Sequence, residues 1–259
     1  MVNHNFCFSI LALNLKYQLL AKELAEDIKK YSPETSVVIG TDNPDIFSDC
    51  RNVLAFKMEK RGILHCYHDK RFVIQEALKK FKIVIQIDAD TRIDNPLPES
   101  FEPSTGLAAI HVENSIEHTK KYNPERLKSL HKLAKKLSLD LETISYVGEA
   151  LFAIVGEEEQ TLEFIRYWDA IARYLELRGI HAGEGHAIGL AAAKVGLEIG
   201  KPSWLKNIHK AKRHLRAASA SDSKPKNILW NNSIRRINYH YRLNKARILA
   251  LKDFDFYYR

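Results

Sequence analysis

A short apolar run that ends in two aspartates constrains this chain more than any other feature. Residues 83–87 (IVIQI) are apolar except for Gln86, which predicts a strand buried on both faces of a sheet. Asp88 and Asp90 follow directly, with one alanine between them. Ligands of open α/β sheets bind at the carboxyl ends of strands, so the two acids stand where a site is expected. Carboxylates at this spacing suit Mg²⁺ or Mn²⁺, and we predict a metal site here rather than a solvated strand end.

Strand and helix patterns alternate along the first ninety residues. Apolar and amphipathic spacing predicts strands over 6–13, 36–40, 52–56 and 82–88, and helices over 16–31 and 70–80. This alternation predicts an α/β fold with a mostly parallel sheet and helices on its faces. Further along, the patterns predict strands over 106–112 and 144–155, the second interrupted at Gly148, and helices over 124–137, 157–178, 187–195 and 231–252. Residues 217–226 (AASASDSKPK) predict a loop.

Positive charge is concentrated in the last quarter of the chain. The net charge is +8, yet residues 200–259 carry 15 Lys and Arg against 3 Asp, whereas the remainder is slightly acidic. We therefore predict a domain over residues 1–200 and a basic extension over 201–259 that packs on or over the site. Such an extension should meet an anion. The candidates are a diphosphate, an anionic membrane, an acidic acceptor and nucleic acid.

The cysteines and the terminal segment bear on location. Three cysteines without metal-binding spacing predict reduced, structural thiols in a cytoplasmic protein. The apolar run over 6–13 is far too short to cross a bilayer. Residues 230–259 mix Lys and Arg with Tyr, Trp, Ile and Leu, the composition of a helix that lies on a membrane surface. Reversible contact with an anionic membrane at its inner face is one interpretation, and a plain packing helix is the other.

The order of these elements resembles the GT-A class of nucleotide-sugar glycosyltransferases. The matching features are the strand FCFSILAL, the Thr41-Asp42 turn, the basic helix start before the fourth strand, and its DAD ending, the DxD motif of that class. The resemblance covers roughly residues 5–200. It implies a Rossmann-like sheet and transfer of a sugar from a nucleotide-sugar, with UDP-sugars favoured, to a saccharide or lipid-linked acceptor. The layout is similar to the retaining lipopolysaccharide galactosyltransferase and glycogenin group and to the blood-group transferases, which favours retention at the anomeric carbon.

The resemblance also implies roles for single residues. Asp90 would ligate Mn²⁺ or Mg²⁺, and Asp88 would touch the metal or the ribose. The ion would neutralise the departing diphosphate. Lys70 and Arg71, at the start of the helix before the DAD strand, would reach the diphosphate or the nucleoside. Asp42 is placed to bind the base or the ribose.

Glycosyl transfer also needs a carboxylate near the anomeric carbon or the acceptor hydroxyl. Glu184 is the first candidate, because Gly183 and Gly185 on either side would let a ligand come close. Glu149 is the second. The simpler interpretation of Glu184 is a residue that caps the following helix.

The basic stretch WLKNIHKAKRH supplies the remaining candidates. Lys206 and Lys210 are expected to bind the diphosphate, since phosphate oxygens attract lysine without strict spacing. His209 is a candidate metal ligand, by analogy with the C-terminal histidine of the retaining group.

Two other functions fit parts of the sequence. Asp88, Asp90 and Thr91 match the DxDxT motif of haloacid-dehalogenase phosphatases, in which Asp88 would be the nucleophile and Asp90 the acid/base. That motif usually lies on the first strand, and no GDxxxD pattern follows here. A basic module that binds nucleic acid is the third hypothesis, but the chain has no recognised RNA-binding motif.

Overall fold

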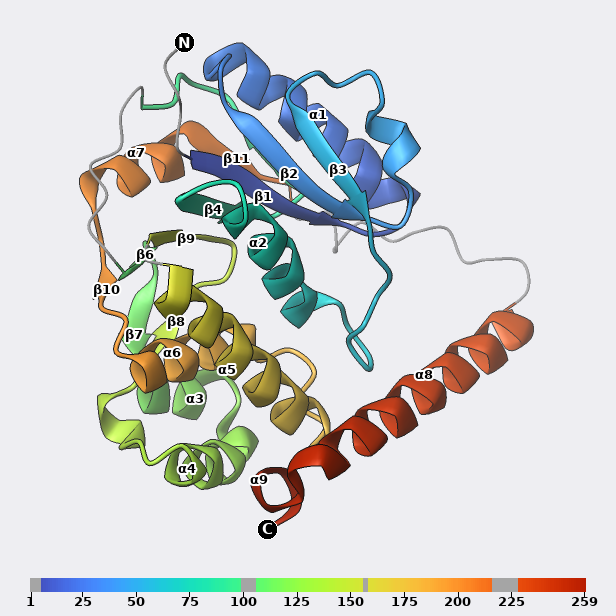
Figure 1. Ribbon diagram of the computed structural model, residues 1–259, viewed down its shortest axis with the longest axis vertical. Coiled ribbons are helices and arrows are strands. Elements are labelled where there is room, and N and C mark those ends of the chain that lie inside the picture. Colours follow the sequence, from blue (N-terminus) through green and yellow to red (C-terminus); the bar gives the residue numbers. More distant parts are fainter. Residues whose placement is uncertain (1–5, 99–105, 156–157, 216–227) are drawn as a thin grey trace.

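A seven-stranded, mostly parallel sheet forms the centre of the molecule (Figure 1). The computed structural model describes residues 6–98, 106–155, 158–215 and 228–259. The strand order is β10-β6-β9-β4-β1-β2-β3, and β9 alone among these runs antiparallel to its neighbours β4 and β6. The strands of this sheet are β1 (Phe6–Ala12), β2 (Ser36–Thr41), β3 (Val53–Lys57), β4 (Ile83–Ile87), β6 (Gly106–Ala109), β9 (Leu151–Val155) and β10 (Ile199–Gly200).

Two small antiparallel ribbons and a set of helices complete the described part of the chain. One ribbon pairs β5 (Thr91–Ile93) with β11 (Lys212–His214), and the other pairs β7 (Val112–Asn114) with β8 (Ser145–Val147). The α-helices are α1 (Leu15–Tyr31), α2 (Lys70–Leu78), α3 (Ser115–Tyr122), α4 (Leu127–Lys136), α5 (Glu158–Glu176), α6 (Glu184–Val195), α7 (Ser203–Ala211), α8 (Ile228–Ala250) and α9 (Phe254–Tyr258). The predicted α/β architecture, a mostly parallel sheet flanked by helices, is confirmed.

The sheet separates two apolar cores because successive side chains of a strand point to opposite faces. On β4, Val84 joins the core that contains residues of α2, α5 and α6, whereas Ile83 and Ile85 join the core under α1 and α7. The predicted strand is buried at all five positions. Its one polar residue, Gln86, accepts a hydrogen bond of 2.8 Å from the hydroxyl of Ser9 on β1. A partner on the neighbouring strand thus satisfies this buried amide.

Several element boundaries differ from the prediction. The predicted strand over 106–112 ends at Ala109, and β7 begins as a separate strand at Val112. The interrupted strand over 144–155 is two strands, β8 and β9, in different sheets. The predicted loop over 217–226 lies outside the described residues. Helices α3 and α7 and the short strands β5, β10 and β11 were not predicted.

The beginning of the predicted C-terminal extension belongs to the core of the domain. In α7, the side chains of Trp204, Leu205 and Ile208 are buried in the same apolar core as α1. Helix α8 instead lies at the margin of the molecule (Figure 1). Arg242 on α8 donates a 3.0 Å hydrogen bond to the carbonyl of Ile63, and Tyr257 of α9 is buried in the other core. No helix among the described residues is long and apolar enough to cross a membrane.

Close packing of α6 on β8 requires a glycine at position 189. A Cβ there would lie 1.7 Å from the carbonyl oxygen of Ser145. We expect the Gly189→Ala variant to lose about 1–3 kcal/mol of unfolding free energy, since overpacking outweighs the better helix propensity of alanine. Urea unfolding followed by circular dichroism measures the loss. Gly200→Ala is the matched control, because nothing lies within 4 Å of its added Cβ. Equal unfolding midpoints for the two variants would contradict this packing.

Candidate active site

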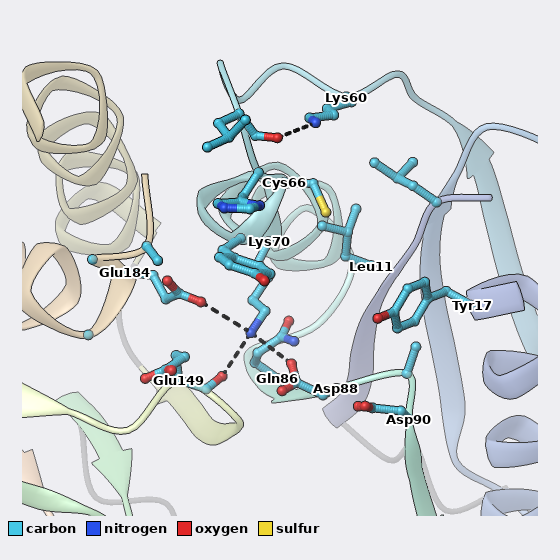
Figure 2. A pocket seen from close by; sticks show the side chains of 18 of the residues that line it. Leu11, Tyr17, Lys60, Cys66, Lys70, Gln86, Asp88, Asp90, Glu149 and Glu184 are labelled. Carbon is cyan, nitrogen blue, oxygen red and sulfur yellow. Dashed lines mark hydrogen bonds and ion pairs between the residues drawn. The ribbon is translucent and has the colours of Figure 1, made fainter. Parts of the chain in front are cut away.

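A cavity of about 560 Å³ opens at the carboxyl ends of β1 and β4 (Figure 2). The start of α1, the segment before α2, the DAD turn, the β8–β9 turn, the start of α6 and the end of β11 all contribute to its wall. Its polar lining residues include Asn14, Tyr17, Lys70, Asp88, Asp90, Glu149, Glu184 and His214. This is the edge at which ligands bind to open α/β sheets.

The two aspartates of the DAD turn face this cavity in different environments. The side chain of Asp88 is 24% exposed and that of Asp90 is 10% exposed. The ribbon between β5 and β11 pairs His214 with Thr91, and this brings Nδ1 of His214 to 3.5 Å from Oδ1 of Asp90. Burial and the nearby charge of Asp90 raise the pKa of Tyr17, whose ring lies closer to Asp90 than to Asp88 in Figure 2.

Lys70 lies between the acidic groups (Figure 2). Its Nζ is 2.7 Å from Oδ1 of Asp88, 3.9 Å from Oε1 of Glu184 and 3.3 Å from the carbonyl oxygen of Glu149. Burial lowers the pKa of Lys70, but the surrounding carboxylates more than offset this, so the net shift of its pKa is upward. A permanently cationic group therefore stands beside the metal-binding candidates, where it can bind an anion.

Glu184 is the first residue of α6 and is 6% exposed. The pKa of Glu184 is raised to about 7: burial is the largest cause, Lys70 lowers the pKa, and the negative charges of Glu149 and Asp88 raise it. Glu149 differs, because its Oε2 accepts a 2.9 Å hydrogen bond from the hydroxyl of Tyr146. Glu184 is thus poised to exchange a proton near neutral pH, the range in which acid–base groups are most effective.

The glycines beside Glu184 have a packing role. Gly183 has φ −145° and ψ 25°, so its φ lies outside the left-handed region that favours glycine. A Cβ on Gly185 would lie 2.4 Å from the ring of Tyr146 and 2.6 Å from the carbonyl oxygen of Val147. The missing side chain therefore lets α6 approach β8. Gly183 and Gly185 also line the cavity, so the close approach of a ligand beside Glu184 stays a prediction.

Two candidates from the sequence lie outside the lining of the cavity. Arg71 follows Lys70 on α2 but points elsewhere, because its Nε and Nη2 donate to Oδ1 of Asp169 at 3.0 and 2.7 Å. Asp42 is exposed, and its Oδ1 accepts hydrogen bonds from the backbone of Asn14 and the side chain of Gln18. Asp42 thereby supports the segment that carries Asn14 and Tyr17 into the cavity wall.

The three candidates on α7 are also remote from the cavity lining. Because α7 buries its apolar side, Lys206, His209 and Lys210 face solvent. The basic residues that approach the acidic pair come from β11 instead. His214 lines the cavity. Burial lowers the pKa of Lys212, and the charges of Asp88 and Asp90 offset this only in part, so the net shift of its pKa is downward. The histidine that lies next to the aspartates is therefore His214, and not His209 as the sequence had indicated.

The donor set at the DAD turn fits a divalent ion. Two carboxylates and an imidazole are ligands that Mn²⁺ accepts, and carboxylates are those that Mg²⁺ prefers. Asp88 and Asp90 line the cavity together with His214. The ligand atoms of these three side chains do not all lie within 4.8 Å of one another. In the described part of the chain, only one other group of three such side chains meets that distance. An ion at this turn would therefore draw the three side chains together.

Comparison with known proteins supports the fold. No protein-family model and no curated protein matches the chain. Among solved structures, the galactosyltransferase LgtC in complex with donor and acceptor sugar analogs is similar over 90% of this chain and 95% of its own, with 9% identity and a TM-score of 0.51. The WbbM bifunctional glycosyltransferase matches 78% of this chain with 13% identity and a TM-score of 0.48, and the match spans only 39% of WbbM. The chain has the GT-A fold.

Proposed function

We propose that this protein is a metal-dependent glycosyltransferase, which transfers a sugar from a nucleotide-sugar to an acceptor hydroxyl. The observation that carries the proposal is the position of Asp88 and Asp90 at the carboxyl end of β4, on the edge of a 560 Å³ cavity in a GT-A fold. LgtC, which shares this fold, binds donor and acceptor sugar analogs in its solved structure. A donor and an acceptor of these classes suit the polar cavity described here, and UDP-sugars are the favoured donors.

The residues of the cavity divide into a donor side and a reaction side. Asp90, Asp88 and His214 would hold Mn²⁺ or Mg²⁺, which supplies the charge that stabilises a diphosphate leaving group. Lys70 would bind the same diphosphate once it exchanges its contact with Asp88 for a phosphate oxygen. Tyr17 and Asn14, at the start of α1, line the cavity on the side of Asp90 and would contact the nucleoside.

Glu184 is the carboxylate we place beside the reacting sugar. As an anion it would stabilise positive charge that develops at the anomeric carbon, or accept the proton of the acceptor hydroxyl. Glu149 is the second candidate, and its hydrogen bond to Tyr146 leaves its other oxygen for the sugar. We propose retention of the anomeric configuration. Proton NMR of the product sugar during turnover reports which anomer forms.

The two other functions gain no support from the fold. In the phosphatase hypothesis Asp88 would follow the first strand, whereas here it follows β4, the fourth strand along the chain. Thr91 is buried in the β5–β11 ribbon. Incubation with p-nitrophenyl phosphate and Mg²⁺ is expected to release no nitrophenol. A nucleic-acid module would bind arbitrary oligonucleotides with steep salt dependence, regardless of changes at Asp88 and Asp90.

A nucleotide screen tests the proposed function. Thermal unfolding is measured with UDP, GDP, CMP and their sugar conjugates, each with Mn²⁺ and with EDTA. A ligand at 100 times its Kd stabilises the native state by about 2.7 kcal/mol, so the cognate nucleotide should raise the Tm by several degrees. We expect this rise only with Mn²⁺ present. A screen in which no nucleotide moves the Tm would contradict the proposal.

Helix α8 carries the features of a membrane contact. Ile234, Ile237, Tyr241 and Ile248 on this helix, and Leu251 directly after it, follow at spacings of three, four and seven residues and are each 42–67% exposed. This spacing places them on one side of the helix, about 100° wide. Exposed basic residues flank the stripe, namely Arg236, Lys245, Arg247 and Lys252. We propose that α8 lies on an anionic membrane, at the inner face of a cytoplasmic membrane, where a lipid-linked acceptor would be found.

Vesicle co-sedimentation tests the contact of α8. The protein should sediment with phosphatidylcholine vesicles that contain phosphatidylserine, and less with phosphatidylcholine alone, because each basic residue near an anionic surface contributes about 1 kcal/mol. The Ile237→Ser/Ile248→Ser variant is expected to lose most of this binding. Leu19→Ser, at an exposed leucine of α1, is the control. Equal sedimentation of the α8 variant and the control would exclude this surface.

A further inference from the structure

A second group of metal-ligating side chains lies beside the cavity. It consists of His111, Glu113 and His118, which we call the His-Glu-His cluster. Nε2 of His111 is 2.9 Å from Oε1 of Glu113, and Nδ1 of His118 contacts the same oxygen. One ligand atom from each residue lies within 4.8 Å of the others, which holds for no other three His, Cys, Asp or Glu side chains among the described residues.

The local sequence explains why the three groups meet. His111 and Glu113 are two residues apart where β7 begins, so their side chains leave the extended backbone on the same side. Asn114 then caps α3, and its side-chain oxygen accepts hydrogen bonds from the backbone of Ile116 and Glu117. The chain therefore turns sharply into α3, and the first turn of that helix brings His118 back to Glu113.

Neighbouring residues pack against both histidines. The ring of Tyr146 stacks on His118 with centroids 3.5 Å apart and an interplanar angle of 9°. Next to His111, a Cβ at position 148 would lie 2.8 Å from Cβ of His111, so only a glycine at position 148 leaves space for His111. Packing thus positions His118 before any ion binds, as a preformed site requires, whereas the ring of His111 is 60% exposed and meets Tyr146 edge-on at 6.0 Å.

The cluster is also connected to the reaction side of the cavity. His118 lines the cavity, and the hydroxyl of Tyr146 donates to Glu149. The carbonyl of Glu149 accepts from Lys70. An ion that fixes His118 would therefore restrain Tyr146 and the β8–β9 turn that carries Glu149.

We propose that the His-Glu-His cluster binds one zinc ion. Two imidazole nitrogens and one carboxylate oxygen form a common three-residue zinc set, which leaves a fourth position for water. The oxygen-rich DAD turn favours Mn²⁺ or Mg²⁺ instead, so the two sites are expected to select different ions. The ion would fix the wall of the cavity next to Glu149, and this inference does not depend on the proposed sugar transfer.

Zinc titration of the full-length, metal-free protein tests the site. Competition with a chromogenic chelator measures the Kd for Zn²⁺ in the wild type and in Asp88→Asn/Asp90→Asn, which lacks the other metal site. We expect one zinc per chain in both. His111→Ala and His118→Ala should each weaken binding by more than the roughly 10–100-fold caused by loss of an outer partner. His131→Ala, at an exposed histidine of α4, should leave the Kd unchanged.

Two further variants keep the test decisive if an alanine variant fails to fold. Glu113→Gln keeps an acceptor oxygen for the histidines but loses the charge, so it should fold and bind zinc more weakly. Gly148→Ala should weaken zinc binding by displacing His111, without removing a ligand. Zinc should also raise the Tm of the wild type and not that of Glu113→Gln. The proposal is overturned if the wild type binds less than one zinc per chain, or if Glu113→Gln binds as tightly as His131→Ala.

Discussion

Replacing Asp90 by asparagine is expected to lower kcat/KM for sugar transfer by at least about 10³-fold. Asparagine has nearly the same shape, but it lacks the charge that holds a divalent ion. An ion that stabilises the leaving diphosphate is worth several kcal/mol, and each 1.36 kcal/mol corresponds to a factor of ten in rate. Transfer of labelled sugar from the cognate donor, measured across a range of Mn²⁺ concentrations, gives the loss. Because asparagine nearly matches the shape of aspartate, the fold should survive the change even though the Asp90 side chain is only 10% exposed.

The matched control for this variant is Asp94→Asn. Asp94 lies just after β5 and forms an exposed ion pair with Arg213 on β11, so it shares the ribbon but not the cavity. Surface ion pairs contribute about 0–1 kcal/mol, and both activity and stability should stay near those of the wild type. Equal activity of the Asp90 and Asp94 variants would remove the DAD turn from the mechanism.

Glu184→Gln is expected to lower kcat by about 10²–10⁴-fold, the contribution of a positioned acid–base group. The Kd for the donor nucleotide with Mn²⁺ should change little, since Glu184 is placed beside the sugar and not the diphosphate. Glu149→Gln should cost less, because glutamine can still accept the hydrogen bond from Tyr146. If the Glu149 variant lost more kcat than the Glu184 variant, Glu149 would be the carboxylate beside the reacting sugar.

The pH dependence of kcat gives a second signature of Glu184. Burial raises the pKa of Glu184 to about 7, so its carboxylate is formed only as the pH rises through neutrality. Activity should therefore increase with pH through about 7 in the wild type. Glutamine does not titrate, so the residual activity of Glu184→Gln should lack this limb.

The central sheet and the DAD turn were predictable because they depend on local patterns. A buried strand is readable from an apolar run, and the carboxyl end of such a strand is a general ligand position. Lys70 was suggested by the resemblance to GT-A enzymes, as a basic residue at the start of the helix before that strand, and it lines the cavity. Its neighbour Arg71 could not be separated from it, because consecutive helical residues point about 100° apart and only tertiary packing decides which one faces the cavity.

What the sequence did not reveal depends on contacts between distant segments. Strand β11 pairs with β5 across more than a hundred residues, and this pairing, not the spacing of WLKNIHKAKRH, brings His214 to Asp90. The exposure of Lys206, His209 and Lys210 follows from the packing of α7 on the sheet, a helix that was not predicted. The antiparallel direction of β9 likewise reflects the path of the chain, and the apolar residues of β9 do not encode it.

Calorimetric titration of the cognate nucleoside diphosphate shows whether an ion at the DAD turn is needed to hold the nucleotide. The wild type and Asp88→Asn/Asp90→Asn are each titrated with Mn²⁺ and with EDTA. We expect tight binding only in the wild type with Mn²⁺, and at least about a hundredfold weaker binding, a loss of about 2.7 kcal/mol, in the other three conditions. Binding of equal strength in EDTA, or in the double variant with Mn²⁺, would show that the nucleotide is held without an ion at the DAD turn.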